Sequence, residues 1–368
     1  MATKWTGGHS TGVLCLDANC EGLVVSGAEE GNLVTWSSEG CPVSSLKLGA
    51  DDITYVSFSR TDSNTLYTSH GEAISILDIR CLKEATECFK VNEDEINCLS
   101  VNETSSHLAA ADDSGSIKII DLANRKVSRT LRKHSNICSC VTFRPQRPHS
   151  LLSCGLDMQV MLWNLQKTRP VWTVNFQELT EEEEEEEEMQ QQAGCQLFNP
   201  PLVHFTSVAS CGNVFACGAE DGKIRIFRIT GTRFELEHGF SGHSLGTSQV
   251  HFLNLSHPYW LLSGGNDGKV ALWDVGERIL KDNRSPSKTT PRKKTKASSP
   301  AKKGLATKEC NLSAQTCKEN KSNHPLAKLS IDHGAKVNWL SSAEIKGRKT
   351  ILVADHTGCI SLYPLTNL

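Results

Sequence analysis

The sequence predicts an all-β protein in which seven four-stranded units close into a single ring. A tight turn rich in Gly, Asp and Glu, followed by an alternating apolar strand, recurs seven times along the 368 residues, and such a period is typical of a repeat architecture. The repeat spacing is close to 42 residues once two low-complexity segments, 177–197 and 276–325, are set aside. No apolar stretch reaches the roughly 18 to 20 residues that a membrane-spanning helix needs, so we expect no membrane association.

Each repeat is predicted to hold four short antiparallel strands separated by Gly, Asp, Asn or Ser turns. In the second repeat these strands are 43–49, 52–59, 65–70 and 73–79. One such sheet has two apolar faces and cannot bury both alone, whereas sheets packed radially bury one another. The final strands of the seven turn-and-strand copies end at Trp36, Leu77, Ile120, Trp163, Phe227, Trp273 and Tyr363.

The two ends of the chain are expected to complete the ring. The last repeat stops at its third strand, 360–365, and an unmatched strand, 2–6, precedes the first repeat. We expect strand 2–6 to pair with the last unit. The whole chain, 1–368, is then one domain.

Two dipeptides connect this period to a known family. In the sixth repeat, Gly242 and His243 stand near the start, and Trp273 and Asp274 stand at the end. A repeat of roughly 40 to 45 residues with these dipeptides resembles the WD repeats, and the resemblance covers about four-fifths of the chain. It implies a single closed seven-bladed WD-repeat β-propeller with two disordered insertions.

In WD repeats a His, a Ser or Thr, an Asp and a Trp form a hydrogen-bonded chain across the blade. The first repeat has His9, Ser26 and Trp36, but Glu30 stands where Asp is usual. Several other repeats replace the Trp and are expected to depend more on apolar packing. By spacing, the resemblance assigns the full network in the fourth and sixth repeats to His134, Ser153, Asp157, Trp163, His243, Ser263, Asp267 and Trp273.

One short motif suggests catalysis. The sequence GHSLG at 242–246 matches G-x-S-x-G, with Ser244 as the nucleophile of a serine hydrolase. That motif requires a strand, a sharp turn and a helix, but residues 247–256 alternate like a strand. Serine hydrolysis by Ser244 is therefore a remote alternative, and we expect no enzyme activity, no cofactor and no small-molecule substrate.

The 15 cysteines are interpreted as buried, reduced thiols of an intracellular protein. There is no CxxC pair, and Cys138 and Cys140 are two residues apart, as on one face of a strand. This spacing argues against a metal site.

The net charge of −3 conceals two oppositely charged segments. Segment 177–197 holds nine Glu and no Lys or Arg, and segment 276–325 holds thirteen Lys or Arg against four acidic residues. Their composition predicts disorder. In a propeller they leave from opposite faces, because the first joins two blades and the second joins the third and fourth strands of one blade. The Glu run is a solvated spacer or a docking strip for a basic partner such as a histone tail.

The basic segment carries two patterns of its own. Ser285, Thr290 and Ser299 each precede Pro with a basic residue beyond, which resembles the sites preferred by cyclin-dependent kinases. The basic segment as a whole is interpreted as a plain linker or a nuclear import signal, and direct contact with nucleic acid is less favoured. We expect the protein in the nucleus and the cytoplasm. A cluster that resembles a nuclear localisation signal comprises Arg292, Lys293, Lys294, Lys296, Lys302 and Lys303.

A final motif suggests a partner. WD-repeat substrate receptors of cullin-four RING ubiquitin ligases carry a WDxR ending whose Arg binds the damaged-DNA-binding adaptor. The second repeat resembles it with Asp78 and Arg80, although Leu77 replaces Trp and the turn 69–73 lacks the usual Asp. The resemblance implies a non-enzymatic protein-interaction scaffold that binds this adaptor. The alternative is a nuclear, chromatin-associated propeller that binds a basic peptide without a ubiquitin role.

Overall fold

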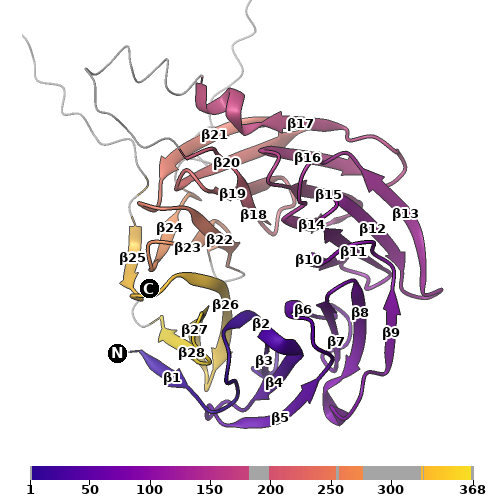
Figure 1. The fold of residues 1–368 in the computed structure, drawn as a ribbon. Coiled ribbons are helices and arrows are strands. Elements are labelled where there is room, and N and C mark those ends of the chain that lie inside the picture. The colour runs from indigo at the N-terminus through magenta and orange to yellow at the C-terminus, as the bar shows by residue number, and fades with distance from the viewer. Residues whose placement is uncertain (1, 182–198, 254–256, 277–324, 326, 366–368) are drawn as a thin grey trace, which may run out of the picture.

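The strands of the protein form seven four-stranded antiparallel sheets around a central axis (Figure 1). This computed structural model describes residues 2–181, 199–253, 257–276, 325 and 327–365. The predicted all-β, seven-bladed propeller is confirmed. None of the helices within these ranges is both long and apolar enough to cross a membrane.

The blades are numbered in chain order, and their strands run from the axis outward. Blade 1 holds β2 (Val13–Ala18), β3 (Val24–Ala28), β4 (Asn32–Trp36) and β5 (Pro42–Lys47). Blade 2 holds β6 (Ile53–Phe58), β7 (Thr65–His70), β8 (Ala73–Asp78) and β9 (Glu87–Lys90). Blade 3 holds β10 (Ile96–Val101), β11 (His107–Asp112), β12 (Ser116–Asp121) and β13 (Lys126–Arg132). Blade 4 holds β14 (Cys140–Arg144), β15 (Arg147–Cys154), β16 (Gln159–Asn164) and β17 (Trp172–Asn175).

The remaining blades follow the same order. Blade 5 holds β18 (Val203–Val208), β19 (Val214–Ala219), β20 (Lys223–Thr230) and β21 (Arg233–Ser241). Blade 6 holds β22 (Thr247–Phe252), β23 (Trp260–Gly265), β24 (Lys269–Asp274) and β25 (Ala327–Asp332). Blade 7 holds β26 (Val337–Ile345), β27 (Arg348–Asp355), β28 (Ile360–Pro364) and β1 (Thr3–Trp5). Two short 3-10 turns are η1 (Glu29–Gly31) and η2 (Ile79–Cys81).

The N-terminal strand supplies the outer strand of the last blade. β1 pairs antiparallel with β28, with Trp5 opposite Ile360, and Thr6 lies just outside the pairing. Trp5 is 3% exposed and stacks on Trp36 of blade 1 with ring centroids 5.9 Å apart. Blades 7 and 1 therefore hold together through both a strand and an aromatic contact.

The sequence repeat and the structural blade are offset by one strand. We expected 43–49 to be a strand of the second unit, but β5 pairs with β4 and belongs to blade 1, and the fourth strand of blade 2 is β9. The reason is local, because Gly40 donates its backbone N–H to Ser37 in a tight turn that folds β5 back along β4.

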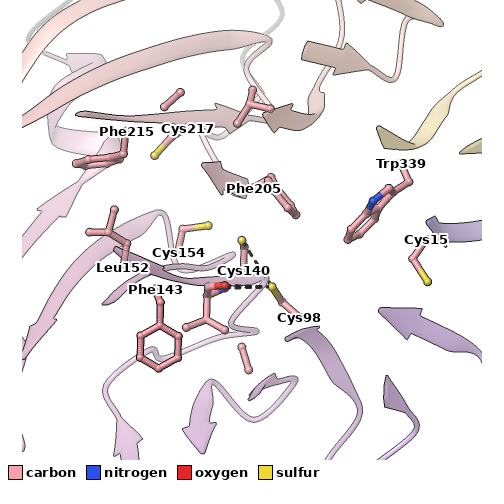
Figure 2. Packing of buried hydrophobic residues seen from close by; sticks show 14 of the residues in the cluster. Cys15, Cys98, Cys140, Phe143, Leu152, Cys154, Phe205, Phe215, Cys217 and Trp339 are labelled. Atoms are coloured by element: carbon pink, nitrogen blue, oxygen red, sulfur yellow. Dashed lines mark hydrogen bonds between the residues drawn. The ribbon is translucent and has the colours of Figure 1, made fainter. Parts of the chain in front are cut away.

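The inner strands place equivalent side chains around the axis. In six blades the residue after the bulge near the start of the inner strand is Cys15, Tyr55, Cys98, Phe205, Gln249 or Trp339, and in blade 4 the first paired residue of the inner strand is Cys140. Figure 2 shows five of these side chains gathered about the channel. Hydrogen bonds to the next blade accompany them, such as Ser139 Oγ to the carbonyl of Val203 at 2.6 Å.

The cysteines divide into two groups. The Sγ atoms of Cys98 and Cys140 are 3.8 Å apart near the channel (Figure 2). The expectation of buried thiols is wrong for the exposed residues Cys20, Cys41, Cys81 and Cys88, which lie in loops or on an outer strand, where no blade covers them. The buried thiols are those of Cys15, Cys98, Cys138, Cys140, Cys154 and Cys217.

The start of the acidic segment is ordered, contrary to expectation. Residues 176–181 form a helical turn beside β17 and β21 (Figure 1). Phe176 is fully buried 5.7 Å from the ring of Phe227, and the Arg225 guanidinium lies over the Phe176 ring. Thr180 accepts a hydrogen bond from Arg225 at 3.1 Å. The composition of 177–197 predicted disorder because composition averages over a whole segment. It does not reveal that a single buried aromatic residue, Phe176, holds the start of this segment against the blade.

Candidate functional site

Asp78 and Arg80 lie where the chain leaves β8, at the end of the third strand of blade 2. Asp78 accepts the backbone N–H of Arg80 at 3.0 Å and its Nε–H at 2.9 Å. The Nη2 atom of Arg80 lies 2.5 Å from the second oxygen of Asp78. The side chain of Arg80 is 69% exposed. The carboxylate therefore orients the guanidinium while leaving it open to a partner.

Each residue of this pair stabilises the charged form of the other. Hydrogen bonds from the Arg80 side chain, and then from its backbone, lower the pKa of Asp78 to about 2. The same contact raises the pKa of Arg80. Both groups are consequently ionised over the whole physiological pH range.

The Leu that replaces Trp in this motif does not disturb the blade. Leu77 is 1% exposed and belongs to the core. In the same hairpin, His70 Nε2 lies 2.9 Å from Ser75 Oγ and joins β7 to β8. The exposed ion pair is thus retained although Leu77 replaces Trp.

The hydrogen-bond networks of blades 4 and 6 bring together all eight assigned residues. In blade 4, Trp163 donates its indole N–H to Ser153 at 2.8 Å, and His134 contacts Ser153 at 2.8 Å and Asp157 at 2.9 Å. In blade 6 the same chain joins Trp273 to Ser263 at 2.8 Å, Ser263 to His243 at 2.9 Å and His243 to Asp267 at 3.0 Å. These residues are structural and tie the loop before the inner strand to the blade.

In blade 1, where Glu30 stands in place of the usual Asp, the hydrogen-bond network is incomplete. His9 lies 2.6 Å from Ser26, and Trp36 donates to Ser26 at 2.7 Å. Glu30 does not reach the imidazole, and His9 Nδ1 has no hydrogen-bond partner within the described residues. Burial lowers the pKa of His9 to about 4, so this histidine is neutral at physiological pH.

Two further networks went unnoticed in the sequence. In blade 3, Asn92 takes the place of the His and donates to Asp112 at 2.8 Å. In blade 7, His333 lies 2.9 Å from Asp355 and 2.9 Å from the hydroxyl of Tyr363. The spacing could have found them, because Asn92 and His333 stand four residues before the first residue of their inner strands, as His9 and His243 stand before Val13 and Thr247.

Ser244 is not placed like a hydrolase nucleophile. It precedes strand β22 rather than a helix, and its hydroxyl contacts Asp267 at 3.3 Å. The neighbouring imidazole of His243 is engaged by Ser263 and Asp267. No three His, Cys, Asp or Glu residues of the described chain gather as metal ligands.

The two patterns of the basic segment lie outside the described residues. These comprise the three Ser/Thr-Pro sites and the cluster that resembles an import signal, namely Ser285, Thr290, Ser299, Arg292, Lys293, Lys294, Lys296, Lys302 and Lys303.

Three stretches of the chain, 83–121, 125–164 and 234–274, match the family described as WD domain, G-beta repeat. Each match begins near or within the outer strand of one blade and ends with the third strand of the next, as the offset requires. These matches support a WD-repeat family. WD-repeat propellers generally serve as scaffolds for protein interactions.

Several known proteins are similar to this chain. It is 28% identical to a WD repeat-containing protein 53 homolog of Dictyostelium discoideum over 96% of this chain and 92% of that protein. It is 26% identical to the methylosome protein WDR77 of Xenopus laevis over 64% of this chain and 66% of that protein. A nuclear distribution protein nudF of Aspergillus niger is 24% identical over 51% of this chain and 37% of that protein.

Proposed function

We propose that this protein is a substrate receptor of a cullin-four ubiquitin ligase and that Asp78 and Arg80 contact its adaptor. The observation that carries the proposal is the exposed, carboxylate-oriented guanidinium at the end of β8. A planar donor fixed in direction and open to solvent is suited to anchor a protein interface. In this proposal the client protein binds at another surface of the ring.

Co-precipitation of the purified adaptor with the full chain tests the proposal. Arg80→Ala should weaken binding at least about tenfold, as expected for an interface anchor. Arg125→Ala is a matched control, because Arg125 also follows a third strand, is 42% exposed and pairs with Glu87. Equal binding by Arg80→Ala would remove the role of this motif, and absence of binding by the unaltered chain would remove the receptor hypothesis.

The alternative function is recognition of a basic peptide on chromatin without ubiquitin chemistry. It is favoured by carboxylates on the opposite face of the ring, where loops join one blade to the next. Burial, followed by the nearby charges of Asp113, Asp52, Asp51 and Asp94, raises the pKa of Glu95. Client levels after depletion of the protein separate the two functions, because only a ligase receptor predicts that its client accumulates.

We further propose that the basic segment directs the protein to the nucleus and that phosphorylation of Ser285, Thr290 and Ser299 regulates this step. Each phosphate adds roughly −1.5 to −2 charges next to the lysine cluster. Imaging of a fluorescent fusion in which the three residues are replaced by Glu should show more protein in the cytoplasm. An unchanged distribution would contradict the regulation.

A further inference from the structure

A cavity of about 760 Å³ occupies the central channel. Its lining includes the ends of the inner strands and the loops that follow them, such as Arg60 and Glu103. The first and third strands of a blade run in the same direction, so these ends lie on the same face as Arg80. We call this the Arg80 face.

Aromatic side chains form part of the cavity wall. Trp339 meets Tyr55 edge to face at 4.9 Å and Phe205 edge to face at 5.7 Å. His251 lies 4.9 Å from Phe205, and burial lowers its pKa to about 4. The imidazole is therefore neutral at physiological pH and adds no positive charge to the wall. Figure 2 shows Trp339 and Phe205 on one side of the channel, across from Cys98 and Cys140.

At one level of this wall a single blade places a carboxylate. Nearer the Arg80 face, the lining also includes Glu103, Glu344, Arg60, Arg144 and Lys349. The equivalent positions of the other inner strands, two residues beyond the aromatic and cysteine level, hold neutral side chains: Ser57, Ser100, Thr142, Ser207, His251 and Ser341. Blade 1 has Asp17 instead, which lines the cavity with Tyr55 and Trp339.

The carboxylate of Asp17 is fixed in place, and Arg60 is the cation that acts on its charge. Its oxygens accept the backbone N–H groups of Ala18 and Phe58, both at 2.9 Å. Within the described chain no Lys, Arg or His forms an ion pair with it. Burial raises the pKa of Asp17, and Arg60 at the mouth offsets this only in part. A cation inside the cavity would stabilise the ionised form.

Serine would satisfy the fold at this position equally well. Ser100 and Ser207 accept the N–H groups of Phe143 and Phe252, each at 3.0 Å, just as Asp17 accepts that of Phe58. The bond between adjacent blades therefore does not require a charge. The negative charge of Asp17 is left without a structural explanation.

We propose that the channel receives a cationic side chain, lysine or arginine, of a partner protein through the Arg80 face. The charged group lies beside the carboxylate of Asp17, and its aliphatic stem lies against Tyr55 and Trp339. A buried carboxylate gains most from a cation that shares its low-dielectric site. Aromatic rings add a cation–π attraction.

Saturation-transfer NMR with the full chain tests this proposal. The probes are acetyl-Gly-Gly-X-Gly-Gly-amide peptides in which X is arginine, lysine or citrulline, the neutral isostere of arginine. We expect at least one cationic peptide to bind about tenfold more tightly than the citrulline peptide, with saturation strongest on its side-chain methylenes. Equal binding of the citrulline peptide, or no binding of either cationic peptide, would overturn the proposal.

Two variants locate the site. Asp17→Ser, which copies blades 3 and 5, should keep the thermal unfolding temperature and abolish the preference for the cationic peptide. Glu103→Gln removes an exposed carboxylate at the mouth of the same cavity and should keep the preference. If Asp17→Ser unfolds, Tyr55→Leu replaces it and should weaken cationic binding at least fivefold. Retention of the preference in a folded Asp17→Ser or Tyr55→Leu protein would contradict the site.

Discussion

Buried serine hydroxyl groups hold several hydrogen bonds at the centre of the best-formed blades. Ser263 is fully buried and joins the indole of Trp273 to the imidazole of His243. Its small side chain therefore satisfies two larger groups that lie inside the protein. Removing the hydroxyl would leave the indole N–H of Trp273 and the Nε2 atom of His243 without a partner, and an unsatisfied buried polar group is costly.

We expect Ser263→Ala to lower the free energy of unfolding by about 2 to 4 kcal/mol, since each orphaned group costs roughly 1 to 3 kcal/mol. Urea denaturation followed by tryptophan fluorescence measures the change. Ser244→Ala is the control, because the exposed Ser244 hydroxyl makes one long contact with Asp267, and surface changes usually alter stability by less than about 0.5 kcal/mol. Similar midpoints for the two variants would contradict this role for Ser263.

At the scale of elements, the tight turns between second and third strands bring one blade close to the next. Gly222 in the turn between β19 and β20 has a φ of 73°. A Cβ atom at this position would lie 2.4 Å from the carbonyl oxygen of His243 in the loop before β22. Glycine is therefore needed here both for its backbone conformation and for the approach of blade 6.

Gly222→Ala should consequently destabilise the protein more than Gly231→Ala does. Gly231 also has a positive φ, of 64°, but a Cβ atom there would meet nothing within 4 Å. Both variants carry the backbone cost of about 1 kcal/mol, and Gly222→Ala adds an overpacking cost of about 1 to 3 kcal/mol. Differential scanning calorimetry compares them. Equal losses of stability in the two variants would show that the loop before β22 can shift to accept the added Cβ atom at no energetic cost.

At the scale of the whole molecule, the ring is closed by residues from both ends of the chain. β1 supplies the edge of blade 7, and Trp5 covers Trp36 of blade 1. In a closed ring each blade packs against a neighbour on both faces, whereas an open ring would expose one face of each terminal blade. Loss of the closing strand β1 should therefore lower the stability of the whole ring.

Deletion of residues 1–8 is expected to lower the unfolding temperature by about 5 to 10 °C, from the lost burial of one Trp in a protein of this size. Circular dichroism melts measure the shift. Lys4→Ala is the control, because Lys4 lies on the same strand with an exposed side chain. An unaltered melting temperature after the deletion would show that the ring does not depend on β1.

The faces of the ring carry different chemistry. The exposed pair of Asp78 and Arg80 and the cavity of Asp17 lie on one face, and the carboxylates around Glu95 lie on the other. The basic segment leaves blade 6 after Gly276, from the Arg80 face. The proposed adaptor contact and the proposed cation site therefore share one face of the propeller.

The sequence by itself determined the number of blades, the short strands and the polar networks of blades 4 and 6. These features repeat locally, because turn residues and alternating apolar residues act within about ten residues of one another. Spacing, together with the resemblance to WD repeats, therefore assigned His134 and His243 to their partners and singled out Asp78 and Arg80.

Only the tertiary structure decided which blade each outer strand joins, and which side chains meet at the axis. β5 pairs with the strand before it, Asn92 replaces His in blade 3, and Phe176 anchors the start of the acidic segment. Asp17 and Trp339 are far apart in the sequence yet line one cavity. Their meeting depends on the angles at which seven blades close, and no local period of the sequence encodes those angles.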